Sequence, residues 1–162
     1  MKINHMRMDD RLIHGQIVTA WIKDSHADTI LLADDKAAGD PTQQMILKFA
    51  VPAGIKLIIV TMKEAYQIIC DDSKKGNALL IVRNPKTACE LFEMGFRIDS
   101  INVGNISNSK SVSGRTKLLN NIYVEQEDVE YLRKIHEFGV HLDVRAVPTD
   151  KSVDGMELIA KL

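Results

Sequence analysis

The sequence predicts an α/β fold: one domain built on a single open, twisted and mostly parallel sheet of about six to seven strands, with helices on both faces. Short apolar runs, each the length of a buried strand, alternate along the chain with stretches of helical periodicity, which is typical of parallel βαβ units. The chain has 162 residues, 45% of them apolar and 27% charged, which suits one domain with its own core. We therefore interpret residues 1–162 as a single domain.

Apolar runs predict the first five strands, at residues 3–8, 29–33, 56–60, 78–82 and 100–103. After the first strand, residues 15–23 have the spacing of an amphipathic helix with Ile17, Val18 and Trp21 on its buried face. Asp40 and Pro41 mark the start of another helix, because Asp caps helices and Pro fits their first turn. The apolar face of that helix is predicted to consist of Ile46, Leu47 and Phe49.

The next two helices carry start and stop signals. Thr61 and Glu64 have the spacing of a capping box, and Ala65, Ile68 and Ile69 follow at helical spacing. Asn84-Pro85 begins a further helix, which Gly95 is predicted to end.

The last third of the chain is predicted to contain a loop, two strands and two helices. Residues 105–116 are rich in Ser, Asn, Gly and Lys and are predicted to form an exposed loop. A short strand at 118–124 precedes a helix at 127–138 that Gly139 ends, with Val129, Leu132, Ile135 and Phe138 facing inward. Apolar residues then alternate at 140, 142, 144 and 146, as in a half-exposed strand, and residues 152–161 form a closing helix.

Charge and cysteine content exclude several classes of protein. Lys and Arg number 21 against 22 Asp and Glu, and the net charge of -1 argues against nucleic-acid binding, which is accompanied by a basic excess. Cys70 and Cys89 lack the spacing of a metal or redox motif and are predicted to be buried thiols in a reducing cytosol. The sequence shows neither a signal peptide nor an apolar run of the roughly 18 residues that a membrane span needs. We expect a cytoplasmic protein that reaches a membrane only through partners.

Several polar residues directly follow predicted strands. The carboxyl ends of parallel strands share one edge of a sheet, and open α/β sheets bind their ligands there. The residues in this position are His14, Asp34, Thr61, Asn84 and Asn105. We expect them to surround one crevice.

His14 is the candidate catalytic residue. Gly15 lets a bound group approach the backbone closely, and the N–H groups of Gly15 and Gln16 at the helix start favour anions. Arg11 adds a permanent charge and a planar fork of donors that suits phosphate oxygens. The field of a helix end is worth only about 0.3–1 kcal/mol for an exposed charge, so we expect Arg11 to dominate phosphate binding. A free imidazole is mostly neutral, and therefore nucleophilic, above roughly pH 6.5.

The acidic pair beside Arg11 permits two interpretations. In one, Asp9 or Asp10 orients Arg11 or the His14 ring, and Asp10 is our candidate orienting residue. In the other, both carboxylates end the strand and hold the turn through bonds to the backbone. Arg7 either reaches the crevice or is a solvated strand residue, and we favour the solvated position.

The remaining histidines have structural interpretations. His5 lies in the first strand, His26 in a turn, His136 on the outer side of its helix and His141 on a late strand. No two histidines have a metal-ligand spacing such as HxxxH, so we predict no metal site.

The segment Arg-Met-Asp-Asp-Arg-Leu-Ile-His-Gly-Gln-Ile, at residues 7–17, resembles the phosphorylation-site signature of IIB subunits of the mannose/fructose/sorbose family of sugar phosphotransferase systems (PTS). Asn84-Pro85 occupies the family's position after the fourth strand. Other segments that resemble the family lie at residues 100–104, 120–121, 139–145 and 148–150. The resemblance covers essentially the whole chain and implies one EIIB domain of the sorbose/mannose type.

The resemblance implies a phosphoryl carrier, classed as a protein-N(π)-phosphohistidine–sugar phosphotransferase. A IIA protein or domain would donate a phosphoryl group to Nδ1 of His14, and the carrier would pass it to a sugar held by the membrane subunits IIC and IID. Arg11 matches the family's arginine three residues before the histidine. The resemblance further implies transfer without metal, nucleotide or other cofactor, peripheral membrane association through IIC/IID, and homodimers as one assembly. The sequence does not choose among mannose, fructose, sorbose and amino sugars.

Residues 105–116 depart from the family's pattern. We interpret them as an exposed variable loop rather than as a source of site residues. The residues to which this applies are Ser107, Ser109, Lys110 and Arg115.

Two other functions compete with the carrier. A non-catalytic phosphate- or nucleotide-binding module is disfavoured because the chain lacks both GxGxxG and GxxxxGK[ST]. A regulatory homologue that binds partners without transferring a group is disfavoured by the intact His14 and Arg11.

Overall fold

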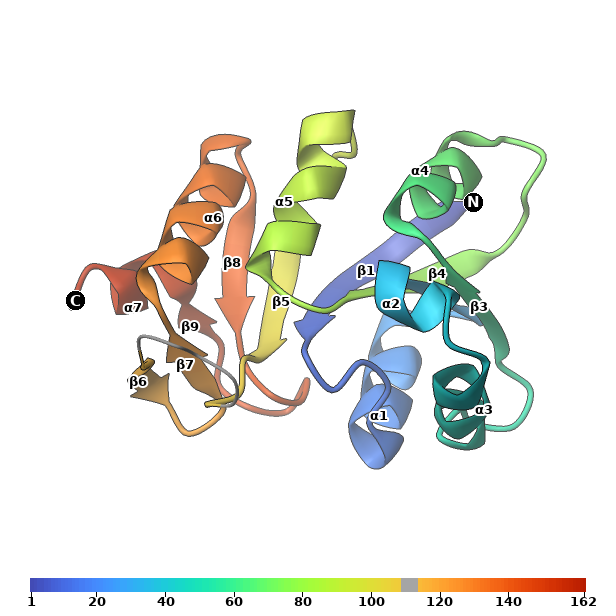
Figure 1. Ribbon diagram of the computed structural model, residues 1–162, viewed down its shortest axis with the longest axis horizontal. Helices are drawn as coiled ribbons and strands as arrows, with labels where there is room; N and C mark the ends of the chain where they lie inside the picture. The colour runs from blue at the N-terminus through green and yellow to red at the C-terminus, as the bar shows by residue number, and fades with distance from the viewer. Residues whose placement is uncertain (109–113) are drawn as a thin grey trace.

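The computed structural model describes residues 1–108 and 114–162. The strands of its large sheet are β1 (Lys2–Asp9), β2 (Thr29–Ala33), β3 (Lys56–Val60), β4 (Asn77–Val82), β5 (Ser100–Asn105), β8 (His141–Val144) and β9 (Val153–Asp154). They lie in the order β3-β2-β4-β1-β5-β8-β9, and every neighbouring pair is parallel except β8 and β9 (Figure 1). The predicted open, mostly parallel sheet is confirmed.

Helices cover both faces of this sheet. They are α1 (Gly15–Ser25), α2 (Asp35–Ala38), α3 (Pro41–Phe49), α4 (Met62–Cys70), α5 (Pro85–Met94), α6 (Gln126–Glu137) and α7 (Gly155–Ile159). Side chains of α1, α2 and α3 share one apolar cluster with Leu32, whereas those of α4 to α7 share another with Leu31. Because successive strand residues point to opposite faces, the two clusters lie on opposite sides of the sheet (Figure 1). Among the described residues, no helix is long and apolar enough to cross a membrane.

The predicted helix signals are confirmed. Thr61 and Glu64 form the capping box of α4, and the Asn84 side chain accepts a hydrogen bond from Thr87 N at the start of α5. The Asp40 side chain caps α3, and Gly95 ends α5 in the left-handed region with φ 117°.

The apolar face predicted for α3 is wrong at two of its three positions. Leu47 is buried, but Ile46 and Phe49 are 65% and 86% exposed. The reason lies in where the helix sits: α3 packs beside the outermost strand β3, so the sheet covers only one narrow side of it (Figure 1).

The prediction for one cysteine is wrong, and one short helix was not predicted. Cys89 is buried in α5 as predicted, but Cys70, at the end of α4, is exposed. The short helix α2 was not predicted; the Asp34 side chain begins it by accepting a hydrogen bond from Ala37 N.

The last third of the chain differs most from the prediction. The expected strand at 118–124 is an antiparallel hairpin of β6 (Thr116–Leu119) and β7 (Ile122–Val124). Strand β8 is mostly buried rather than half-exposed, because β9 and α7 cover it. The closing helix is shorter than predicted because residues 153–154 pair with β8 and Asp154 then caps α7.

Candidate active site

The loop that follows β1 lies at a point of the sheet where two neighbouring strands are followed by helices on opposite faces. Parallel pairing aligns Met8 of β1 with Val82 of β4, so both strands end at the same edge. From that edge α1 leaves β1 toward one face of the sheet, and α5 leaves β4 toward the other. Such a switch point is where open α/β sheets bind ligands.

His14 is the N-terminal cap residue of α1 and is exposed. Its carbonyl accepts hydrogen bonds from Ile17 N and Val18 N, whereas its side chain makes no capping bond. Gly15 follows with φ +30°, and no atom lies within 4 Å of the place a Cβ would take. The ring and the first N–H groups of α1 therefore border open space, which suits a group bound from outside.

The two residues before His14 anchor this loop in the core. Leu12 and Ile13 are 1% and 6% exposed and belong to the apolar cluster under α1 and α3. Leu12 adopts φ 64°, an uncommon conformation for a non-glycine residue, and its N–H donates to the carbonyl of Asp9. The loop is thus fixed at both ends while His14 points outward.

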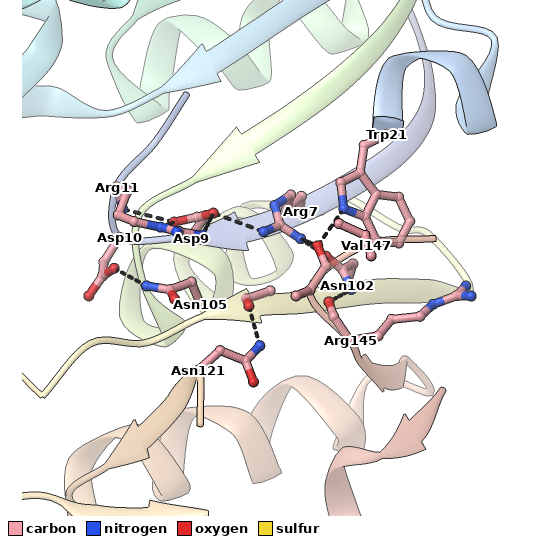
Figure 2. Close-up of polar contacts among 12 residues, drawn as sticks. Arg7, Asp9, Asp10, Arg11, Trp21, Asn102, Asn105, Asn121, Arg145 and Val147 are labelled. Atoms are coloured by element: carbon pink, nitrogen blue, oxygen red, sulfur yellow. Dashed lines mark hydrogen bonds and ion pairs between the residues drawn. The ribbon is translucent and has the colours of Figure 1, made fainter. Parts of the chain in front are cut away.

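Asp9, not Asp10, contacts Arg11. One Asp9 oxygen accepts hydrogen bonds from the backbone N–H and the Nε of Arg11 (2.9 and 3.0 Å), and the other accepts one from Nη2 of Arg11 at 3.0 Å. Asp9 is 1% exposed at its side chain, and the Arg11 side chain is 33% exposed. A buried carboxylate thus holds one edge of the Arg11 guanidinium (Figure 2), and the Arg11 side chain is partly exposed to solvent.

Arg7 is fully buried, so the solvated position that we favoured for it is wrong. Its Nη2 donates to Asp9 at 2.9 Å, and its Nη1 donates to the side chain of Asn102 and to the carbonyl of Ala146 (Figure 2). Burial lowers the pKa of Arg7, and the Asp9 carboxylate partly opposes that effect. Gly104 makes room for this group, because a Cβ there would overlap the guanidinium.

Asp10, our candidate orienting residue, contacts a different part of the chain. Its carboxylate accepts hydrogen bonds from Asn105 Nδ2 (2.7 Å), Ser107 N (2.7 Å) and Ser107 Oγ (2.8 Å). Asp10 therefore ties the segment after β5 to the loop after β1 (Figure 2). The contact with Arg11 that we assigned to it belongs to Asp9.

Arg115, also in the 105–116 segment, makes its side-chain contacts with the β6–β7 hairpin and α6. Arg115 donates to Asp128 at 2.9 Å and to the carbonyl of Tyr123 at 3.1 Å, which joins the β6–β7 hairpin to α6. Ser109 and Lys110 lie outside the described residues.

The other strand-end residues share the predicted edge, but hydrogen bonds occupy their side chains. Thr61 and Asn84 cap helices, and Asn105 binds Asp10. Asp34 forms a two-bond ion pair with Arg83, at 2.8 and 2.7 Å. Of the five predicted residues, His14 is the one exposed to solvent without a side-chain bond to its own helix.

Arg83 was missed by the sequence analysis. It follows directly after β4, the same position that drew attention to the other residues, and this placement was the available signal. Burial raises the pKa of Asp34, but the Arg83 guanidinium and the Ala37 N–H outweigh it, so that pKa is lowered overall. The hydrogen bond to Asp34 raises the pKa of Arg83.

His5 has a structural role. Its ring stacks on Trp21 with centroids 4.5 Å apart, and its Nε2 is buried without a hydrogen-bond partner among the described residues. Burial lowers the pKa of His5 to about 4, with nearby Asp143 and Asp24 opposing the shift. Within residues 1–108 and 114–162, no group of three or more His, Cys, Asp or Glu side chains is arranged to hold a metal ion.

Comparisons with known proteins agree on one family. The sequence profile described as "PTS system sorbose subfamily IIB component" matches residues 3–162. The sorbose-specific EIIB component of Lacticaseibacillus casei is 32% identical, and the match covers 100% of this chain and 96% of that protein. The mannose-specific EIIAB component of Escherichia coli (strain K12) is also 32% identical over 100% of this chain, which spans about half (50%) of that relative's length.

Solved structures of the same family share the fold. The crystal structure of the IIBSor domain of the Klebsiella pneumoniae sorbose permease matches with a TM-score of 0.92 and 28% identity, covering 99% of this chain and 98% of that one. The N-acetylgalactosamine-specific IIB component 1 from Escherichia coli matches with a TM-score of 0.87 and 29% identity, covering 93% and 97%. The chain therefore belongs to the sorbose subfamily of PTS IIB components, within the mannose/fructose/sorbose family of sugar phosphotransferase systems.

Proposed function

We propose that this chain is a phosphoryl carrier that accepts a phosphoryl group on His14 and passes it to an incoming sugar. The observation that carries the proposal is an exposed imidazole at the start of α1, on a fixed loop that also presents the guanidinium of Arg11. Family membership supports it, because PTS IIB components are parts of sugar phosphotransferase systems.

The residues of this loop have separate roles in the proposal. His14 supplies the nucleophilic nitrogen, and Arg11 binds oxygens of the phosphoryl group through the N–H groups that Asp9 does not occupy. The backbone N–H groups of Gly15 and Gln16 add weaker donors at the helix start. One exposed arginine and a helix end form a moderate clamp, which suits a carrier that must release what it accepts.

Each transfer is a displacement at phosphorus that balances without a cofactor. In the first, the lone pair of a neutral His14 nitrogen forms the new N–P bond while the donor phosphohistidine recovers the electron pair of the broken one. The proton lost from the other nitrogen of His14 balances the proton gained by the donor ring. In the second, a sugar hydroxyl oxygen attacks phosphorus, and the hydroxyl proton ends on the departing imidazole.

The partners follow from this chemistry. A IIA protein or domain carrying a phosphohistidine is the donor, and the EIIAB composition of the mannose-specific relative supports this choice. The acceptor sugar is held by membrane subunits IIC and IID, which would bring a cytoplasmic carrier to the membrane surface. Both partners must reach the same atom of His14, so they compete for overlapping surfaces. Binding of both partners at once would contradict this competition.

Phosphorylation of the purified chain tests the proposal. The chain is incubated with radiolabelled phosphoenolpyruvate, the general phosphotransfer proteins and its IIA partner, and an acid-labile phosphoprotein is expected. His14→Ala should abolish labelling, whereas the matched control His141→Ala, an exposed histidine on β8, should not. Label that persists in His14→Ala would refute the proposal.

Arg11→Lys tests the role of the guanidinium. Lysine keeps the charge but loses the planar fork, so onward transfer to sugar should slow while the fold is retained. Wild-type transfer rates in this variant would remove the argument for Arg11.

A further inference from the structure

The N–H groups of Arg11 fall into two sets, one that Asp9 binds and one that no described residue binds. Asp9 occupies the edge formed by Nε and Nη2, with both hydrogen bonds at 3.0 Å. Nη1 makes no hydrogen bond to another described residue, and the Arg11 side chain is 33% exposed. The unoccupied N–H groups therefore lie on the edge away from Asp9, and the bidentate contact keeps the guanidinium plane from rotating.

The Asp9 carboxylate is itself held in place by the buried Arg7. Arg7 donates to it from inside the sheet through Nη2, and Nη1 of Arg7 donates to the side chain of Asn102 and to the carbonyl of Ala146. The buried Nε of Arg7 has no hydrogen-bond partner among the described residues. Asn102 and Ala146 come from β5 and from the segment after β8, so two strands and one loop together fix one carboxylate. An arginine on a flexible stem thereby becomes a rigid group at the surface.

The net charge of Arg7, Asp9 and Arg11 together explains why the buried Arg7 is useful to the site. A carboxylate paired with Arg11 alone would cancel the positive charge that a phosphoryl group needs. With the buried Arg7 included, two positive charges share one negative charge, and one positive charge remains in excess. Asp9 can thus hold Arg11 in place without neutralising the site.

We propose that Asp9, held by the buried Arg7, is a positioning residue for phosphoryl transfer that fixes the orientation of the Arg11 guanidinium. This inference rests on the proposed roles of His14 and Arg11. Asp9 acts through Arg11 and touches no reacting atom, so removing it should matter only when Arg11 is present.

A double-mutant cycle on the rate of phosphoryl transfer from phosphorylated IIA to His14 tests this dependence. Asp9→Asn keeps the shape of the side chain but removes its charge and one acceptor oxygen. In the wild-type background it should slow transfer about 10- to 100-fold, the effect of an ångström-scale misplacement of a binding group. In the Arg11→Gln background it should slow transfer by less than about threefold, because there is no guanidinium left to orient.

Asp10→Asn is the matched control, because it removes the adjacent carboxylate, which binds Asn105 and Ser107 instead of Arg11. Its effect should be the same factor in both backgrounds. Equal losses from Asp9→Asn in both backgrounds would refute the positioning role while leaving His14 as the labelled residue. Label that survives His14→Ala would instead refute the proposed function.

A measurement on the unmodified protein covers the case in which Asp9→Asn does not fold. In ¹⁵N-labelled protein, the Nε–H of Arg11 should exchange slowly with water because Asp9 accepts it, whereas that of the exposed Arg133 should exchange rapidly. Rapid exchange at both arginines would overturn the inference.

Discussion

Replacing His5 by phenylalanine should make the protein less sensitive to mild acid. His5 lies in β1, its ring stacks on Trp21 with an interplanar angle of 8°, and burial lowers its pKa to about 4. Phenylalanine keeps an aromatic partner for Trp21 but has no proton to gain. The variant thus isolates the titration of one side chain.

The sign and size of the effect follow from linkage. The pKa of His5 falls from its ordinary 6.5 to about 4 on folding, so the unfolded chain takes up the proton first as the pH falls. The contribution of His5 to stability is complete above pH 6.5 and is lost progressively between pH 6.5 and pH 4. At pH 5 the loss amounts to about 1–2 kcal/mol for a ring that retains some solvent contact.

Denaturant unfolding at pH 7.5 and at pH 5 measures this loss. The free energy of unfolding of the wild-type chain should fall more over this interval than that of His5→Phe, by about 1–2 kcal/mol. His26→Asn is the control, because His26 is exposed in a left-handed turn that asparagine also adopts, and it should lose stability in parallel with the wild type. Parallel losses in the wild type and His5→Phe would refute the reasoning.

Four further substitutions test the packing and the capping of the fold. Leu47→Ala should lower the free energy of unfolding by about 2–5 kcal/mol and Phe49→Ala by less than about 0.5 kcal/mol, because only Leu47 is buried. Chemical denaturation of both variants measures this difference, and equal losses would contradict the placement of α3. Gly104→Ala should cost about 3 kcal/mol or more by displacing Arg7 from its buried ion pair, and a wild-type melting temperature would show that the pair has room to move. Asn84→Ala should cost about 1 kcal/mol through loss of the α5 cap, and an unchanged denaturation midpoint would show that the cap is dispensable.

The parts of the fold that local chemistry determines were predictable. The runs at 29–33 and 56–60 coincide with β2 and β3. Strand β2 is buried on both faces, as a continuous apolar run in a parallel sheet predicts, whereas the outermost strand β3 is only partly buried. The caps at Asp40, Thr61 and Asn84 were also predicted, since a cap is completed within four residues. The short elements α2 and β9 were missed because they carry too few residues to show a period.

The site was less predictable where its contacts join distant segments. Buried Arg7 donates through Nη1 to Asn102 and to the carbonyl of Ala146, and neither of these partners is visible from the sequence around it. The choice between Asp9 and Asp10 was likewise undecided, because adjacent side chains at a strand end point in different directions. Asp10 turns toward Ser107, almost a hundred residues further along the chain.

The buried side chains of Leu12 and Ile13 have a consequence for how partners distinguish the two states of the proposed carrier. Because these two side chains are buried, we expect the loop to keep nearly the same shape whether or not His14 carries a phosphoryl group. What changes on loading is the charge, by roughly two negative units. Preference for the loaded over the empty form should therefore be electrostatic and should weaken as ionic strength rises.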